Sequence, residues 1–225
     1  MSAGLSALVT PTPRTRSSAR CAVGVAAILF PLVYLVSDLV EVAQGDFTLF
    51  RLSLTYAGEA GFPLFVVGLA MLVQDWIPRW ATAGALAYAY SYVFFTSTVV
   101  WAIAARTPDW ETLGEVFGWW MTVHGAIMVV GGIAFGVGVA RSGILPPWTG
   151  WALAVGVVLV AGASGMGNPE RTVAAAVPDA AFIGMGIALL ARPCSGSTEE
   201  AVSSRESPPR PRSPRRGRRR PGSPG

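Results

Sequence analysis

The sequence predicts an all-α fold, a polytopic bundle of six transmembrane helices followed by a disordered C-terminal tail. Only 13% of the 225 residues are charged and 52% are hydrophobic, whereas soluble domains carry about a quarter charged residues. Long stretches without charge alternate with short polar ones, as expected where lipid surrounds the chain. Beyond residue 193, almost nothing apolar occurs.

Six apolar stretches are long enough to be spans, because about 20 helical residues, rising about 1.5 Å each, cross the hydrocarbon core. The predicted spans are 21–42, 55–76, 81–105, 115–140, 148–165 and 171–191. Together they define a transmembrane domain over 21–192, after a cytoplasmic N-terminal segment over 1–20 and before a tail over 193–225.

The first span resembles the start of a secretory signal peptide, since Arg14, Arg16 and Arg20 precede it. However, its apolar stretch is too long, and residues 37–41 read Ser-Asp-Leu-Val-Glu rather than a small-residue cleavage site. We therefore expect an uncleaved first helix.

The arginine distribution predicts the orientation. With the N-terminus inside, fourteen arginines fall in cytoplasmic segments and only Arg51, Arg106 and Arg171 fall outside. Because inner loops are enriched in basic residues, both termini are expected in the cytoplasm. The absence of lysine and the Ala, Gly, Val and Pro bias indicate a GC-rich bacterial genome. The expected location is the bacterial cytoplasmic (plasma) membrane, as a multi-pass protein.

The outer segment 107–111, Thr-Pro-Asp-Trp-Glu, is typical of a helix start. Thr107 is the expected cap, Pro108 lies in the first turn, and the acidic residues lie near the positive end of the helix dipole. This pattern predicts a short helix on the outer surface that runs into Trp119 and Trp120.

The tail over 193–225 carries eight arginines and three glutamates, a net charge of +5, whereas residues 1–192 carry −1. Its composition cannot bury enough apolar surface to order it. Clustered arginines near an anionic leaflet gain about 1 kcal/mol each. The expected partners are the lipid bilayer and anionic lipid headgroups, a cytoplasmic protein partner is the alternative, and no specific nucleic acid is predicted. The contacting residues are expected to be Arg215, Arg216, Arg218, Arg219 and Arg220.

Four ionisable side chains fall at bilayer depth, where each costs at least a few kcal/mol and is by default a functional candidate. The helical rise places His124 about 14 Å and Asp179 about 12 Å from the outer side. It places Asp38 about 25 Å from the inner side, in the outer half as well. The shared depth predicts one intramembrane polar cluster of Asp38, Glu59, His124 and Asp179, with Glu41, Glu115 and Arg171 as second-tier members.

Two interpretations of this cluster stay open. A histidine among carboxylates can shuttle protons, and the same groups suit a divalent cation or a cationic solute. Alternatively, Asp38, Glu41 and Glu59 reach to interfacial water, and His124 bonds to Asp179 only to satisfy both. The main hypothesis is a non-enzymatic scaffold or accessory membrane protein of unknown biochemical function. The alternative is a small proton- or solute-handling transporter.

No catalytic motif occurs in the sequence: GxSxG, HExxH, a phosphate loop and a dinucleotide fingerprint are all missing. We therefore expect no enzyme, no catalytic residue, no cofactor and no metal site. Cys21 and Cys194 fall at cytoplasmic helix ends and are expected to be reduced thiols.

The segment 141–150, Arg-Ser-Gly-Ile-Leu-Pro-Pro-Trp-Thr-Gly, resembles a recurrent hairpin of uncharacterised small six-helix integral membrane proteins of GC-rich bacteria. The resemblance covers the membrane region and not the tail. It implies the six-helix architecture, and it implies no activity and no functional residues.

Overall fold

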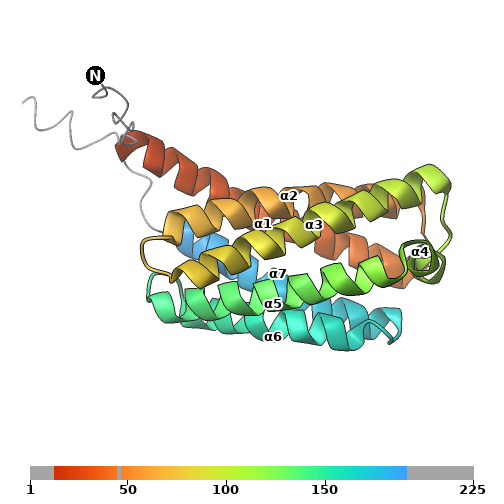
Figure 1. Ribbon diagram of the computed structural model, residues 1–225. Coiled ribbons are helices and arrows are strands. Elements are labelled where there is room, and N and C mark those ends of the chain that lie inside the picture. Colours follow the sequence, from red (N-terminus) through yellow and green to blue (C-terminus); the bar gives the residue numbers. More distant parts are fainter. Residues whose placement is uncertain (1–12, 45–46, 192–225) are drawn as a thin grey trace, which may run out of the picture. The chain divides into compact units, whose positions relative to one another are not determined.

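The computed structural model describes residues 13–44 and 47–191, and every regular element in this part is a helix (Figure 1). The all-α prediction is therefore confirmed for these residues. The helices are α1 (Pro13–Gln44), α2 (Leu49–Val73), α3 (Arg79–Ala105), α4 (Trp110–Phe117), α5 (Trp119–Ser142), α6 (Pro147–Ala163) and α7 (Asn168–Leu190).

Five helices of the described part, α1, α2, α3, α5 and α7, are long and apolar enough to cross a membrane. Helix α6 is apolar but has only 17 residues, which span about 25 Å against a hydrocarbon core of about 30 Å. Each predicted span coincides with a helix, but the count of six membrane spans is not confirmed.

The six long helices form a closed ring in chain order, in which each packs against two neighbours and α7 returns to α1. A Cβ added at Gly24 of α1 would lie 3.0 Å from the Leu190 side chain of α7. Because Gly24 lies in the first half of α1 and Leu190 ends α7, the chain enters and leaves the bundle at the same end (Figure 1). Helix α4 lies at the opposite end, which we call the α4 end.

The outward face of α1 is an apolar stripe. Its large side chains recur every three or four residues, so they share one face of the helix. The exposed fraction lies between 42% and 56% for each of Val25, Leu29, Leu32, Val36 and Leu39. An apolar surface of this kind is suited to lipid rather than to water.

An aromatic cluster fills the middle of the ring and connects four of its helices. Phe62 of α2 stacks on Tyr92 of α3, with the ring centroids 4.3 Å apart. The same Phe62 ring meets Phe182 of α7 at 5.7 Å and Tyr34 of α1 at 5.9 Å, both edge-on. Such pairs favour one fixed packing of the helices.

Helix α4 is the short helix that the outer segment predicted, but its cap is Asp109 rather than Thr107. The Asp109 carboxylate accepts a hydrogen bond of 2.8 Å from the Thr112 N–H. The helix therefore starts after Pro108, and a full negative charge lies at its positive end. Gly118, with φ of +50°, then separates α4 from α5, so the fourth predicted span begins at Trp119 and not at residue 115.

Two further expectations concern the ends of the bundle. Helix α1 begins at Pro13, within the segment expected to precede the membrane domain. Cys21 is disulfide-bonded, so the expectation of a reduced thiol is wrong for this residue. The predicted tail, with its lipid-contacting arginines, lies outside the described residues.

Candidate functional site

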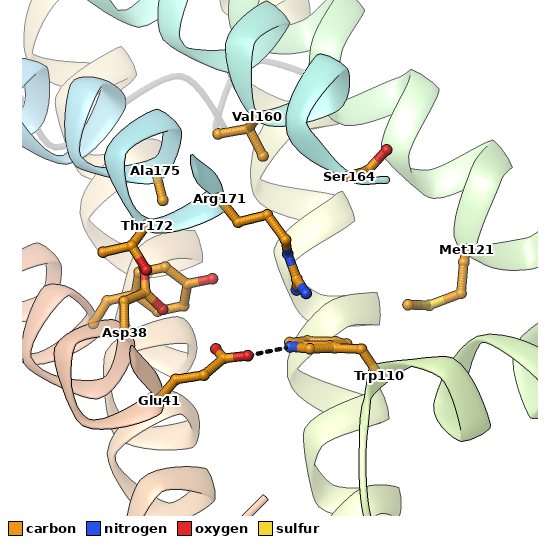
Figure 2. Close-up of a pocket in the computed structure, with 10 residues that line it drawn as sticks. Asp38, Glu41, Trp110, Met121, Val160, Ser164, Arg171, Thr172 and Ala175 are labelled. Carbon is orange, nitrogen blue, oxygen red and sulfur yellow. Dashed lines mark hydrogen bonds between the residues drawn. The ribbon is translucent and has the colours of Figure 1, made fainter. Parts of the chain in front are cut away.

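A cavity of about 280 Å³ lies at the α4 end and is lined by residues of α1, α4, α5, α6 and α7 (Figure 2). Small-molecule sites usually enclose about 300–1,000 Å³, so this cavity suits a small solute. Its ionisable lining residues are Asp38 and Glu41 of α1 and Arg171 of α7, together with the Tyr34 phenol. Both signs of charge therefore face one space.

Glu41 is fully engaged in contacts with other helices. The Arg51 guanidinium of α2 donates to Glu41 Oε2 and forms an ion pair with it. Trp110 Nε1 of α4 donates to Glu41 Oε1 at 3.2 Å (Figure 2). A buried carboxylate with both oxygens satisfied joins three helices and has little capacity left for a ligand.

Arg51 is a residue that the sequence reading missed as part of the site. The sequence predicts that Arg51 lies in an outer segment, yet only 1% of it is exposed. Its guanidinium carbon lies 4.5 Å from the Phe47 ring centroid and 5.7 Å from that of Trp110, distances typical of cation–π contacts. The sequence does contain a signal for this ion pair, because Glu41 and Arg51 lie ten residues apart on either side of the short connection between α1 and α2.

Asp38 and Arg171 differ from Glu41 because neither has a charged partner in contact. Only 8% of Asp38 is exposed, and among the described residues its carboxylate accepts no hydrogen bond. The Arg171 guanidinium lies over the Trp110 ring, 5.3 Å from its centroid, and points into the cavity (Figure 2). In the same part of the chain, the one ion pair within 4.0 Å is that of Arg51 with Glu41.

Two further carboxyl groups are buried close to Asp38. Glu59 of α2 and Asp179 of α7 are each 3% exposed. Glu59 Oε2 and Asp179 Oδ2 have no hydrogen-bond partner among the residues that the structure describes. The charge of Asp38 acts on both groups, and all three acids act on Tyr34. We call Tyr34, Asp38, Glu59 and Asp179 the polar site.

His124 lies apart from the polar site, between α3 and α5. Its Nδ1 is 2.9 Å from the Trp120 carbonyl oxygen, and its Nε2 is 3.3 Å from the Tyr90 hydroxyl. The Phe94 ring stacks on the imidazole at 3.7 Å. The expected bond from His124 to Asp179 is therefore not formed. Glu115 is exposed on α4, so it does not line the cavity either.

The described residues contain no group of three or more His, Cys, Asp or Glu side chains placed to hold a metal ion. What the arrangement offers instead is a small cavity with one cationic and one anionic wall, next to two buried carboxyl groups. Such groups can take up protons or hold a cationic group.

No protein-family model, curated protein or solved structure matches this chain. The resemblance of segment 141–150 to uncharacterised membrane proteins stays a prediction.

Proposed function

We propose that this protein is a small transporter of the bacterial cytoplasmic membrane, which handles protons or a small solute through the polar site. The observation that supports it is the pair of unpartnered carboxyl oxygens, Glu59 Oε2 and Asp179 Oδ2. A buried polar atom without a partner costs about 1–3 kcal/mol, and an acid at membrane depth is a functional candidate by default. Glu41, in contrast, has a partner for each of its oxygens.

The route into the site is the cavity at the α4 end. Tyr34 lines this cavity and also contacts Phe62 of the aromatic cluster. A solute that enters from the α4 end therefore reaches Tyr34 and Asp38, the two members of the polar site that line the cavity, and the aromatic cluster begins at the Phe62 ring that Tyr34 contacts. Transport then needs a second arrangement of the helices that opens the other side, as in alternating access.

The proposed orientation puts the α4 end outside and both termini in the cytoplasm. It is supported by the arginine distribution and by the shared end at which α1 starts and α7 finishes. The disulfide at Cys21 argues for the opposite orientation, because disulfides are rare in the cytoplasm. The sidedness of reporter fusions decides between the two orientations.

A flux assay tests the transporter. The full chain is reconstituted in liposomes that contain the pH-sensitive dye pyranine, and an external acid pulse is applied. We expect proton entry above that of protein-free liposomes, and a loss of at least tenfold in Glu59→Gln and in Asp179→Asn. Glu115→Gln makes the same chemical change at an exposed residue and is the matched control.

The second candidate function is a non-enzymatic scaffold or accessory membrane protein. The engaged Glu41–Arg51 pair favours it, because it shows that one buried charge of this bundle serves helix packing. In that case the main contact surface would be the predicted tail arginines. They would contact anionic headgroups or a protein partner. Wild-type protein would then show no flux of protons or of any solute.

A further inference from the structure

We infer that the cavity binds a small zwitterionic amino compound, with its ammonium group at Asp38 and its carboxylate at Arg171. This inference rests on the proposed function, because it names the class of solute that the polar site would handle.

The first step is the separation of two opposite charges across one cavity. Asp38 lines it from α1 and Arg171 from α7, and the charge of Arg171 acts on Asp38. The two groups are nevertheless not in ion-pair contact, since the one such pair in the described part is Arg51 with Glu41. Space for a ligand therefore lies between the carboxyl group of Asp38 and the guanidinium of Arg171, neither of which has an ion-pair partner in this part of the chain.

The second step is the mismatch with singly charged solutes. A simple cation at Asp38 would face the guanidinium of Arg171, and a simple anion at Arg171 would face the carboxylate of Asp38. Like charges brought together in this way cost several kcal/mol. A molecule with an ammonium and a carboxylate group satisfies both walls at once, and charge-assisted hydrogen bonds are the stronger kind.

The third step concerns selectivity within the cavity. Glu41 does not compete for the ammonium group, because Arg51 and Trp110 occupy its two oxygens. The Trp110 ring lies against Arg171, so it limits where the guanidinium can point. The Thr172 hydroxyl also lines the cavity and offers a hydrogen bond to a carboxylate, whereas the Ser164 hydroxyl donates to the Ala161 carbonyl oxygen. The volume of about 280 Å³ accommodates a small amino compound.

Calorimetry on the detergent-purified full chain tests this. The probes are glycine, β-alanine and γ-aminobutyrate, which differ in the separation of their charges, with ethylamine and propionate as singly charged controls. We expect at least one zwitterion to bind at least tenfold more tightly than either control.

Two variants assign the two charges of the ligand. Asp38→Asn should remove the preference for the zwitterion over propionate, because the ammonium group loses its partner. Arg171→Gln should remove the preference for the zwitterion over ethylamine, because the carboxylate loses its partner. Asp75→Asn and Arg79→Gln make matched changes at exposed residues of the opposite end and should leave all affinities unchanged. If either cavity variant elutes as an aggregate, Asp38→Glu or Arg171→Lys replaces it, and the preferred charge separation should then shift along the series.

The outcomes separate this inference from the proposed function. Ethylamine binding as tightly as every zwitterion overturns the inference and leaves a cation-handling site. Absence of binding by all probes, with proton flux that depends on Glu59 and Asp179, overturns the inference and supports proton handling. Absence of both binding and flux overturns the inference and the proposed transporter together.

Discussion

The guanidinium of Arg51 pairs with the carboxylate of Glu41, and both side chains are buried inside the bundle. Because Trp110 donates to the other Glu41 oxygen, this one pair holds α1, α2 and α4 together at the α4 end. It also lies next to the cavity, so the wall that carries Asp38 depends on it.

Replacing Arg51 by methionine should strongly destabilise the protein. The substitution leaves the Glu41 carboxylate buried without its cation, which typically costs about 3–5 kcal/mol. Thermal or denaturant unfolding in detergent measures the change in the free energy of unfolding.

The double variant Arg51→Met with Glu41→Met is the control. An apolar pair of similar volume is often as stable as the buried ion pair it replaces, so the double variant should recover most of the loss. A double variant that is less stable than Arg51→Met alone would show that the pair is not the cause.

Removing a carboxyl group from the polar site should have the opposite effect on stability. Glu59→Met eliminates a buried oxygen without a partner, so the free energy of unfolding should rise by about 1–3 kcal/mol, while flux is lost. Stability and activity often oppose each other in this way at functional sites. A fall in stability would instead favour a structural role for Glu59 and the scaffold hypothesis.

The contact between α5 and α6 should not tolerate a methyl group at Gly150. A Cβ there would lie 2.4 Å from the Gly136 carbonyl oxygen and 2.4 Å from the Ala140 nitrogen. These are backbone atoms, so the two helices must separate, and overpacking of this kind costs about 1–3 kcal/mol. Gly150→Ala should unfold at a correspondingly lower temperature.

Gly125→Ala is the matched control in α5. A Cβ at Gly125 meets nothing within 4 Å, so this variant should gain roughly 0.5–1 kcal/mol from the better helix propensity of alanine. Equal effects of the two substitutions would contradict the close approach of α5 and α6.

Helix α4 should lose part of its stability in acid. Hydrogen bonding from the Thr112 N–H lowers the pKa of Asp109, so the charged cap is stabilising above the usual pKa of about 4. This contribution fades as the pH falls through the lower pKa of the folded state. The protection factors of the α4 amides, which correct for the intrinsic slowing of amide exchange in acid, should therefore fall in acid in wild type and change little in Asp109→Asn.

The orientation can be measured with alkaline phosphatase fusions, since this enzyme is active only outside the cytoplasm. A fusion after Gly225 should be inactive, and one inserted at Pro108 should be active. If the start of α1 and the end of α7 lie on the same side of the membrane, α6 must also cross it. Activity of both fusions would therefore refute six crossings.

The positions of the helices could be predicted from the sequence because they depend on local properties. Long apolar runs need helical hydrogen bonding in lipid, and turn residues end them. The resulting spans match the observed helices closely, and the short helix α4 was predicted as well. The errors at Thr107 and at residue 115 are local too, because competing caps and a glycine with positive φ decide where one helix starts and another ends.

The sequence by itself determined that the chain is helical, apolar enough for a membrane, and equipped with acids inside its apolar stretches. Only the tertiary structure decided which of these acids meet. Depth along a helix follows from residue number, but the direction of a side chain around the ring depends on which helices are neighbours. Asp38, Glu59 and Asp179 lie on α1, α2 and α7, which are consecutive in the ring, whereas His124 faces α3. Arg51 became part of the site for the same physical reason, because the packing of α1, α2 and α4 buries it against Glu41.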